Sequence, residues 1–459
     1  MAGWANLHDL IRSEIGLKNQ QHANAEPFYD KLAAAGDDEQ AQMAVYEELM
    51  RLPPDPALEK NEPNALASIF ALAPSVPDLG PLPDAAALQD KFLGAYLGRS
   101  AGCALGKPIE AGPYMGGMDG RSGTENVRLW FEGADAWPIE NYTPEHSRAE
   151  QTHNLFISQA CIASTREHIQ YMETDDDIRY TILGLHLMEE KGHNWTSYDV
   201  GKLWHAKLPY RWVCTAETQA YLNFARVTYH HEASQPADWD KKEQWVRTYL
   251  NPMRELIGAQ IRVDAYAYAA AGNPRLAAEL AWRDASFSHE RNGIYGAMFI
   301  AAAIAAAFVT PDPDKIVAAG LGVIPAQSRL AKVVNETVEL AREATDGYEL
   351  ARALWDKYAH FGPVHAINNT ALCVASLLVA RGDYTRALAT SVLGWDTDCN
   401  GATVGSIMGA ALGAKHLPAH WTKPLNDTIY SGVIGYHPIA ISQCAQRSYQ
   451  TYLDLQKAR

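Results

Sequence analysis

The sequence predicts an all-α fold, and three observations support this prediction. Apolar residues in the periodic segments recur three and four positions apart, as Leu7, Leu10, Ile11 and Ile15 do. The strict alternation of apolar and polar residues that marks half-buried strands is absent. Ala, Leu and Gln dominate the periodic segments, and these residues favour helices. We therefore expect helices throughout and no β-sheet.

Length and proline placement predict one large domain with an N-terminal appendage. The chain has 459 residues, and 47% of them are hydrophobic, which is enough for a sizeable core. Residues 1–50 have the spacing of surface helices. Prolines crowd between residues 52 and 84 and exclude a continuous helix there. We predict a helical extension with a Pro-rich linker at 1–85 and a catalytic domain at 86–459.

The charge and the cysteines exclude several classes of protein. A formal net charge of −15 and the lack of a Lys/Arg-rich run disfavour nucleic-acid binding. The longest apolar run, residues 294–309, is shorter than the roughly 20 residues of a membrane span, so we expect a buried core helix. Six cysteines without a C-x-x-C pair argue against disulfides and structural zinc. The N-terminus lacks a signal-peptide pattern, and we expect a cytoplasmic protein.

Two segments carry glycine at every fourth position. The first has glycines at 94, 98, 102 and 106, and the second has them at 401, 405, 409 and 413. Each glycine costs a helix about 1 kcal/mol relative to alanine, so the pattern needs a reason beyond local propensity. Steps of four keep the glycines on one helical face, where another backbone can approach closely. We expect the two helices to pack together and to bring Glu110 near Asp396 and Asp398; the alternative is two unrelated helices packed elsewhere.

Two acidic segments have the composition of a cation site. Asp175, Asp176 and Asp177 open one apolar helical segment, and Asp396 and Asp398 precede the second glycine-rich one. One Asp at a helix start caps free N–H groups, but three consecutive ones exceed that need. Carboxylates are the ligands that Mg²⁺ and Mn²⁺ prefer. The second segment also matches the first half of a calcium loop, but Ile407 stands where that loop needs Glu. Ordinary capping and solvated turns are the alternative.

Three further segments are interpreted as loops or loop-to-helix junctions. Residues 120–150 contain Trp130, Phe131 and Trp137 without a period, which indicates a long surface loop or lid. His289 stands in a polar segment between two Ala-rich helical runs, where it could bind a ligand. Residues 361–370 lead into an apolar helix.

In this order along the chain, three of these segments together resemble the ADP-ribosylglycohydrolase family. The family opens with a Gly-x-x-x-Gly ladder that ends in Gly-x-Pro-x-Glu, continues with a Thr/Ser-Asp-Asp-Thr turn, and closes with Gly-Asp-Thr-Asp-Thr-x-Gly-Ala. Here the corresponding segments are Gly94–Glu110, Thr174–Ile178 and Gly394–Gly405. The resemblance covers residues 90 to 420, and it is the combination of motifs that makes it specific.

The resemblance implies a helical bundle with a binuclear Mg²⁺ or Mn²⁺ cleft that hydrolyses the bond at C1″ of an ADP-ribosyl group. The metals would fix the ribose and activate the attacking water. The catalytic carboxylates would be Glu110, Asp176 and Asp177. The metal ligands would come from Thr174, Asp175, Asp176, Asp177, Asp396 and Asp398. His289 would lie near the ribose and phosphates, and we also predict substrate contacts from Asn368, Asn369 and Gly401.

The chain departs from the family pattern at two places. Cys399 stands where the family has the closing Thr, and sulfur is a poor ligand for a hard cation. The acidic turn fits either as Thr174–Asp177 or as Asp175–Ile178, and each register replaces one family threonine. We prefer the second register because it places Tyr180, Ile182 and Leu183 on an apolar helix.

Three functions stay open at this stage. The first is removal of ADP-ribose from a protein side chain or a small conjugate. The second is hydrolysis of a small ribofuranoside or other N- or O-glycoside, if the extension and the 128–142 segment narrow the cleft. The third is a ligand-binding relative that has lost catalysis. No nucleic-acid or membrane partner is expected.

Overall fold

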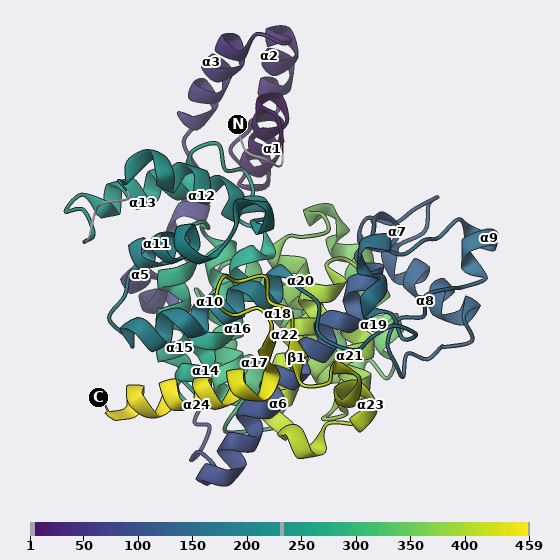
Figure 1. The fold of residues 1–459 in the computed structure, drawn as a ribbon. Coiled ribbons are helices and arrows are strands. Elements are labelled where there is room, and N and C mark those ends of the chain that lie inside the picture. The colour runs from purple at the N-terminus through teal and green to yellow at the C-terminus, as the bar shows by residue number, and fades with distance from the viewer. Residues whose placement is uncertain (1–4, 230–233, 458–459) are drawn as a thin grey trace.

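Helices form nearly the whole molecule, which is described by a computed structural model over residues 5–229 and 234–457 (Figure 1). Residues 1–4 of the predicted extension lie outside this description. The first helices are α1 (Leu7–Gln20), α2 (Pro27–Ala35), α3 (Glu39–Met50), α4 (Pro56–Asn61) and α5 (Leu66–Leu72). The next elements are α6 (Ala85–Gly106), η1 (Lys107–Ile109), α7 (Gly112–Met115), α8 (Gly123–Gly133), α9 (Ala149–His153), η2 (Gln159–Ser164), α10 (Asp176–Lys191), α11 (Ser197–Lys207), η3 (Tyr210–Trp212), α12 (Thr215–Val227), α13 (Trp239–Thr248) and η4 (Ile257–Arg262).

The second half of the chain completes the bundle. Its elements are α14 (Asp264–Ala269), α15 (Pro274–Ala285), α16 (Asn292–Ala307), α17 (Pro313–Leu321), α18 (Arg329–Glu343), α19 (Gly347–Tyr358), η5 (Ala359–Phe361), α20 (Ala366–Ala380), α21 (Tyr384–Ser391), α22 (Thr397–Leu412), η6 (Ala414–His416), α23 (Ala419–Thr422), η7 (Lys423–Leu425), β1 (Thr428–Ile429), β2 (Ile439–Ala440) and α24 (Ile441–Lys457).

The all-α prediction is confirmed. Within the described residues, the only strands are β1 and β2, which pair antiparallel over two residues each. The predicted core helix is α16, and every one of its residues is buried. None of the described helices has the length and apolarity needed to cross a membrane. The Pro-rich segment contains only the short helices α4 and α5, as the prolines require.

Helices α6 and α22 pack backbone to backbone at the centre of the bundle, as the glycine spacing predicts (Figure 1). A methyl carbon at Gly98 would lie 2.1 Å from the carbonyl oxygen of Gly405, and one at Gly94 would lie 2.4 Å from that of Gly409. At the other end, Gly106 lies against the backbone of Thr397. The two helices therefore run antiparallel. This direction places the start of α22 beside the residues that follow α6.

The N-terminal helices form a separate small unit. Helices α1, α2 and α3 enclose their own apolar core and project from the bundle at the top of Figure 1. Buried ion pairs connect this unit to the rest. Glu14 of α1 pairs with Arg254 at 2.6 Å, and Gln21 donates to Glu255 at 2.7 Å. Arg329 binds both Glu255 and Glu62, which precedes α5. Charge therefore connects the unit to the bundle, together with Leu250, which packs in the apolar core of the unit.

The prediction of a continuous surface loop at 120–150 is wrong for residues 123–133. This segment forms α8, and Ser122 caps it by accepting a hydrogen bond from the Glu125 amide at 3.1 Å. Trp130 and Phe131 are buried on its inner face.

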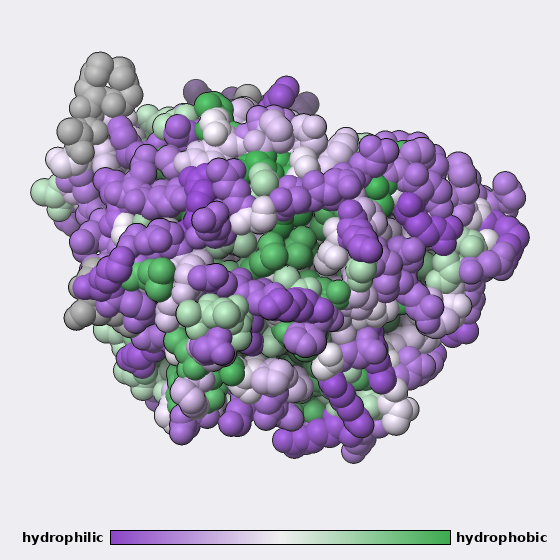
Figure 2. Space-filling view, turned by 60° about the horizontal axis from the view of Figure 1, so that its bottom comes forward, coloured by the Kyte–Doolittle hydropathy of each residue, from purple (hydrophilic) through white to green (hydrophobic). Residues whose placement is uncertain are grey.

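The surface of the molecule is mostly hydrophilic, and Figure 2 shows hydrophobic side chains gathered near the middle of one face.

Candidate metal centre

The two acidic segments meet at the start of two helices. Asp175 is the N-cap of α10, where its Oδ1 accepts a hydrogen bond from the Asp177 amide at 3.2 Å. Asp396 is the N-cap of α22, and Asp398 lies in the first turn of the same helix. Helix starts carry partial positive charge, which favours carboxylates at these positions. The structure thus brings together residues that lie more than two hundred positions apart in the sequence.

The carboxylates form two groups with the spacing of cation ligands. In the first group, one atom each from Cys103, Asp175, Asp177 and Asp398 lie within 4.8 Å of one another. In the second group, the same holds for Asp396, Asp398 and Cys399. Asp398 belongs to both groups and joins them into one centre.

Two carboxylate oxygens in this centre have no hydrogen-bond partner. They are Oδ2 of Asp177 and Oδ1 of Asp398, and the two residues are 0% and 1% exposed. A buried charged oxygen without a partner is costly, and a cation is the usual way to offset that cost. These two atoms are the strongest structural indication of a ligand.

Buried basic side chains neutralise part of the cluster. Arg99 of α6 lies between Asp177 at 3.1 Å and Asp264 at 2.9 Å, with 1% of its side chain exposed. Lys107 donates to Oδ2 of Asp175 at 2.6 Å. The carboxyl groups still outnumber these two cations, so they lie close to one another without full neutralisation by basic side chains.

This crowding changes the acidity of the carboxyl groups. Burial raises the pKa of Asp398 to about 7, and the charge of Asp175 adds to the effect. Burial and the same neighbour raise the pKa of Asp176 to about 8. For Asp175 burial acts in the same direction, but Lys107 and Arg179 reverse it and hold its pKa below the usual range. Burial and Asp398 raise the pKa of Glu110. Such shifts are typical of groups that bind cations or transfer protons.

A strained turn and one asparagine position Asp396. Gly394 and Trp395 have φ values of 124° and 58°, and the Trp395 ring stacks on Trp355 at 5.3 Å. The Asn369 Oδ1 then accepts hydrogen bonds from the Asp396 amide at 3.2 Å and from the Asn400 side chain at 2.8 Å. A non-glycine residue with positive φ costs free energy, so surrounding contacts must hold this turn in place.

Comparison with known proteins identifies the family of this chain. The family model described as ADP-ribosylglycohydrolase matches residues 84–451. The chain belongs to the ADP-ribosylglycohydrolase family. A solved chain titled "ADP-ribosylglycohydrolase-related protein complex" superposes with a TM-score of 0.48 at 18% identity, over 80% of this chain and 99% of that one. No curated protein matches the sequence. Family membership implies a hydrolase of the ADP-ribosylglycohydrolase type.

The residues that the sequence predicts for the site fall into two sets, the acidic residues with Thr174 and the residues predicted to bind substrate. Glu110 and the five aspartates lie together, with Glu110 and Asp176 partly exposed and the other four buried. Thr174 lies beside them, but its hydroxyl donates to the Ser431 carbonyl at 3.0 Å and accepts from Arg179 at 2.9 Å. As metal ligands and catalytic groups, these residues stay predictions.

The predicted substrate-binding residues are all buried, and Asn369 accepts a hydrogen bond from the Asp396 amide within the cluster. His289 lies in the loop between α15 and α16, as predicted, but its side chain is fully buried. Its Nδ1 hydrogen bonds with Ser288 at 2.8 Å, and burial together with Arg262 lowers its pKa. Asn368 and Asn369 donate to the carbonyls of Gly362 and Pro363, and Gly401 packs against Gly102. Their contact with substrate stays a prediction.

Sequence reasoning missed Arg99, Lys107 and Cys103. Arg99 carried a usable signal, because a charged side chain inside a helix of small and apolar residues needs a buried partner. Lys107 and Cys103 gave no comparable signal. Their role depends on the antiparallel packing of α6 and α22, which only the structure shows.

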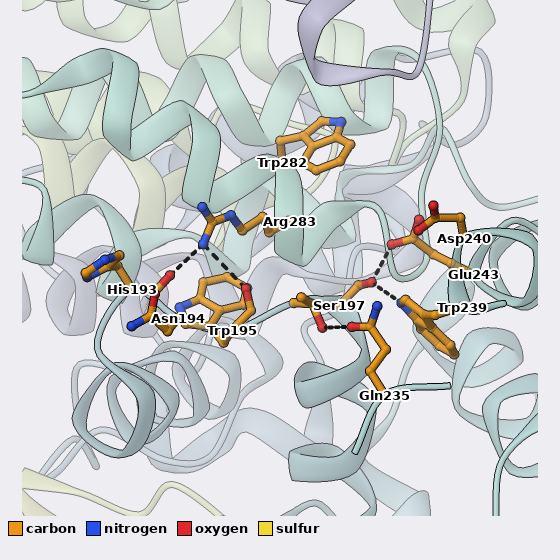
Figure 3. Close-up of a pocket in the computed structure, with 11 residues that line it drawn as sticks. His193, Asn194, Trp195, Ser197, Gln235, Trp239, Asp240, Glu243, Trp282 and Arg283 are labelled. Carbon is orange, nitrogen blue, oxygen red and sulfur yellow. Dashed lines mark hydrogen bonds between the residues drawn. The ribbon is translucent and has the colours of Figure 1, made fainter. Parts of the chain in front are cut away.

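A separate cavity of about 460 Å³ shares no residue with the acidic cluster (Figure 3). Its polar groups are largely paired within the protein. Arg283 donates to the carbonyls of His193 at 2.6 Å and Trp195 at 3.4 Å, and the Trp239 indole donates to Ser197 at 2.9 Å. The acidic cluster is therefore the better candidate for the functional site.

Proposed function

We propose that this protein hydrolyses the C1″ glycosidic bond of an ADP-ribosyl group, and that it requires two divalent cations, Mg²⁺ or Mn²⁺. The observation that carries the proposal is the pair of ligand groups that share Asp398, each with buried carboxylate oxygens. They lie inside the segment that matches the family model. Asp177 and Asp398 would hold one cation, and Asp396 and Asp398 would hold the other.

The donor set fits hard or borderline cations. Carboxyl oxygens dominate both groups, and the carboxyl groups outnumber the two basic side chains, Arg99 and Lys107, that pair with them. When bound, such cations supply binding energy for vicinal ribose hydroxyls and lower the pKa of a nearby water. Arg99 would hold Asp177 in position, and Asn369 would hold Asp396.

Glu110 is the best candidate for proton transfer. It follows α6 directly, is partly exposed, and lies close enough to Asp398 for that charge to raise its pKa. A carboxyl group with a raised pKa can take a proton from water near neutral pH and then release it. Asp176, also partly exposed, is the second candidate. Positive charge that develops at C1″ would be stabilised by the surrounding carboxylates.

The test is hydrolysis of three substrate classes by the metal-loaded protein. ADP-ribosyl-arginine, ADP-ribosyl-serine and simple nucleosides are each assayed with Mg²⁺ and with Mn²⁺. We expect activity on an ADP-ribosyl substrate that falls at least about a hundredfold in Asp398→Asn, because a ligand of both groups is lost. Asp454→Asn, an exposed carboxylate on α24, is the matched control and keeps full activity.

Two results would change the conclusion. Activity on nucleosides alone would replace the ADP-ribosyl substrate by a small ribofuranoside. Calorimetry that detects no Mn²⁺ binding, or binding unchanged in Asp398→Asn, would indicate a relative without this metal chemistry.

A further inference from the structure

The first ligand group contains a thiol on the glycine-rich helix α6. The sulfur of Cys103 lies within 4.8 Å of one carboxylate oxygen each from Asp175, Asp177 and Asp398. Cys103 is 0% exposed. Nothing in the described part of the chain hydrogen bonds with its sulfur. Packing alone explains a small residue at this position, but not a polarisable atom placed among three carboxylates.

The neighbouring atoms show which ligands are free. Both oxygens of Asp175 are engaged, Oδ2 by Lys107 and Oδ1 by the Asp177 amide. Asp177 Oδ2 and Asp398 Oδ1 are buried without partners. The first group therefore offers a cation the sulfur of Cys103 and one oxygen each from Asp177 and Asp398, two residues that each have a buried oxygen without a partner. They come from α10, α22 and α6, so the folded chain assembles them.

We propose that Cys103 is a sulfur ligand of this metal centre and that it selects borderline cations such as Co²⁺ or Fe²⁺ over Mg²⁺. The proposal rests on the metal centre proposed above and changes its preferred cation from Mg²⁺ or Mn²⁺ to a softer one. On binding, the thiol proton passes to solvent as the metal–sulfur bond forms. Thiolate favours softer cations, and the affinity of mixed sites rises from Mn²⁺ through Fe²⁺ to Co²⁺, whereas Mg²⁺ prefers oxygen alone.

Cys399 is the other cysteine in the acidic cluster that could bind a cation, and its surroundings differ from those of Cys103. It belongs to the second ligand group, but it also packs against Ile257 and Ile261, with Val364 beside them. Cys103 also packs in the apolar core of the bundle, so burial does not distinguish the two cysteines, but Cys103 has three neighbouring carboxylate residues and Cys399 has two. The two cysteines can therefore be separated by substitution.

The experiment is Co²⁺ titration of the metal-free full-length protein, followed by absorption spectroscopy. A sulfur-to-cobalt charge-transfer band is expected in the wild type and is lost in Cys103→Ser. The band remains in Cys399→Ser and in Cys444→Ser, a buried cysteine of α24 distant from the acids. Calorimetry of Cys103→Ser should show at least about a tenfold loss of Co²⁺ affinity, because a direct ligand matters at least as much as the residues that orient ligands. Mg²⁺ affinity should stay within about threefold.

The outcomes separate this inference from the proposed function. If Mn²⁺ and Co²⁺ bind and require Asp398 but no charge-transfer band forms, or the band survives in Cys103→Ser, the sulfur ligand is wrong and the metal centre stands. If neither ion binds the wild type, both proposals fail. Circular dichroism checks that Cys103→Ser is folded. Should it not fold, X-ray absorption of the cobalt-loaded wild type decides by the presence or absence of a sulfur neighbour.

Discussion

Two interfaces of this protein hold helices together by different kinds of contact. The α6–α22 interface is made of glycine backbones, whereas the interface between the N-terminal unit and the bundle combines the buried Glu14–Arg254 ion pair with apolar packing of Leu250. The first interface leaves no room for any side chain, and it ends at the metal centre. The second depends on the exact partners of a few charges, and it lies beside residues 255–257. The first interface therefore depends on the close fit of two backbones, and the second depends on the pairing of buried charges.

The largest effect is expected from a methyl group in the glycine interface. In Gly98→Ala the new carbon would lie 2.1 Å from the Gly405 carbonyl oxygen, and backbone cannot move aside as a flexible side chain can. We expect a loss of more than about 4 kcal/mol of unfolding free energy, or no folded protein. Chemical denaturation measures this loss. A variant as stable as the wild type would show that the two helices are not in backbone contact.

A substitution in the ion-pair interface should destabilise the protein less than Gly98→Ala does. Glu14→Gln leaves Arg254 buried with only Glu290 as its charged partner, at 2.9 Å. Breaking a buried pair from one side costs about 3–5 kcal/mol, so we expect a value near the lower end. The measurement is again denaturation, with the exposed pair variant Glu339→Gln as control. A loss below about 1 kcal/mol would mean that this pair does not hold the N-terminal unit in place.

His365 lies beside the ion-pair interface and makes it sensitive to acid. It is the N-cap of α20, its Nδ1 accepts from the Ile367 amide at 3.2 Å, and it neighbours Glu255. Burial lowers its pKa to about 4. The unfolded chain therefore binds a proton between about pH 6.5 and pH 4 that the folded chain does not, so stability falls as the pH falls through this range.

The size of this effect can be isolated by substitution. His365→Asn keeps a capping oxygen and removes the titration. We expect the stability advantage of the wild type over this variant to shrink by about 3 kcal/mol from pH 7 to pH 4. Parallel pH curves for the two proteins would contradict the assignment.

The sequence made the glycine interface predictable, because a period of four defines one helical face without any knowledge of the partner. It also indicated the acidic residues, since three consecutive aspartates exceed what capping needs. It did not indicate the pairing of Glu14 with Arg254, which lie 240 positions apart. A single Glu on an amphipathic helix looks like any solvated residue until the bundle covers it.

The helix α8 and the burial of His289 also escaped prediction, for different reasons. Helix α8 is hard to predict because Trp130 and Phe131 are followed by prolines and acidic residues without a helical period. Ser122 and Glu125, which have the spacing of a capping box, marked its start. The burial of His289 could not be seen because it depends on Arg262 and Glu217 from distant segments.

The smallest expected effect is a stabilisation, and it tests whether a glycine of the N-terminal unit differs from the glycines of α6. Gly16 lies inside α1 of the N-terminal unit, where an added methyl carbon would approach nothing closer than the Tyr29 hydroxyl at 3.7 Å. Here glycine only weakens the helix, so Gly16→Ala should raise the unfolding free energy by up to about 1 kcal/mol. Denaturation alongside Gly98→Ala measures both. If the two substitutions destabilise the protein equally, glycine in α6 is not there for backbone contact, and the contrast between the two interfaces does not hold.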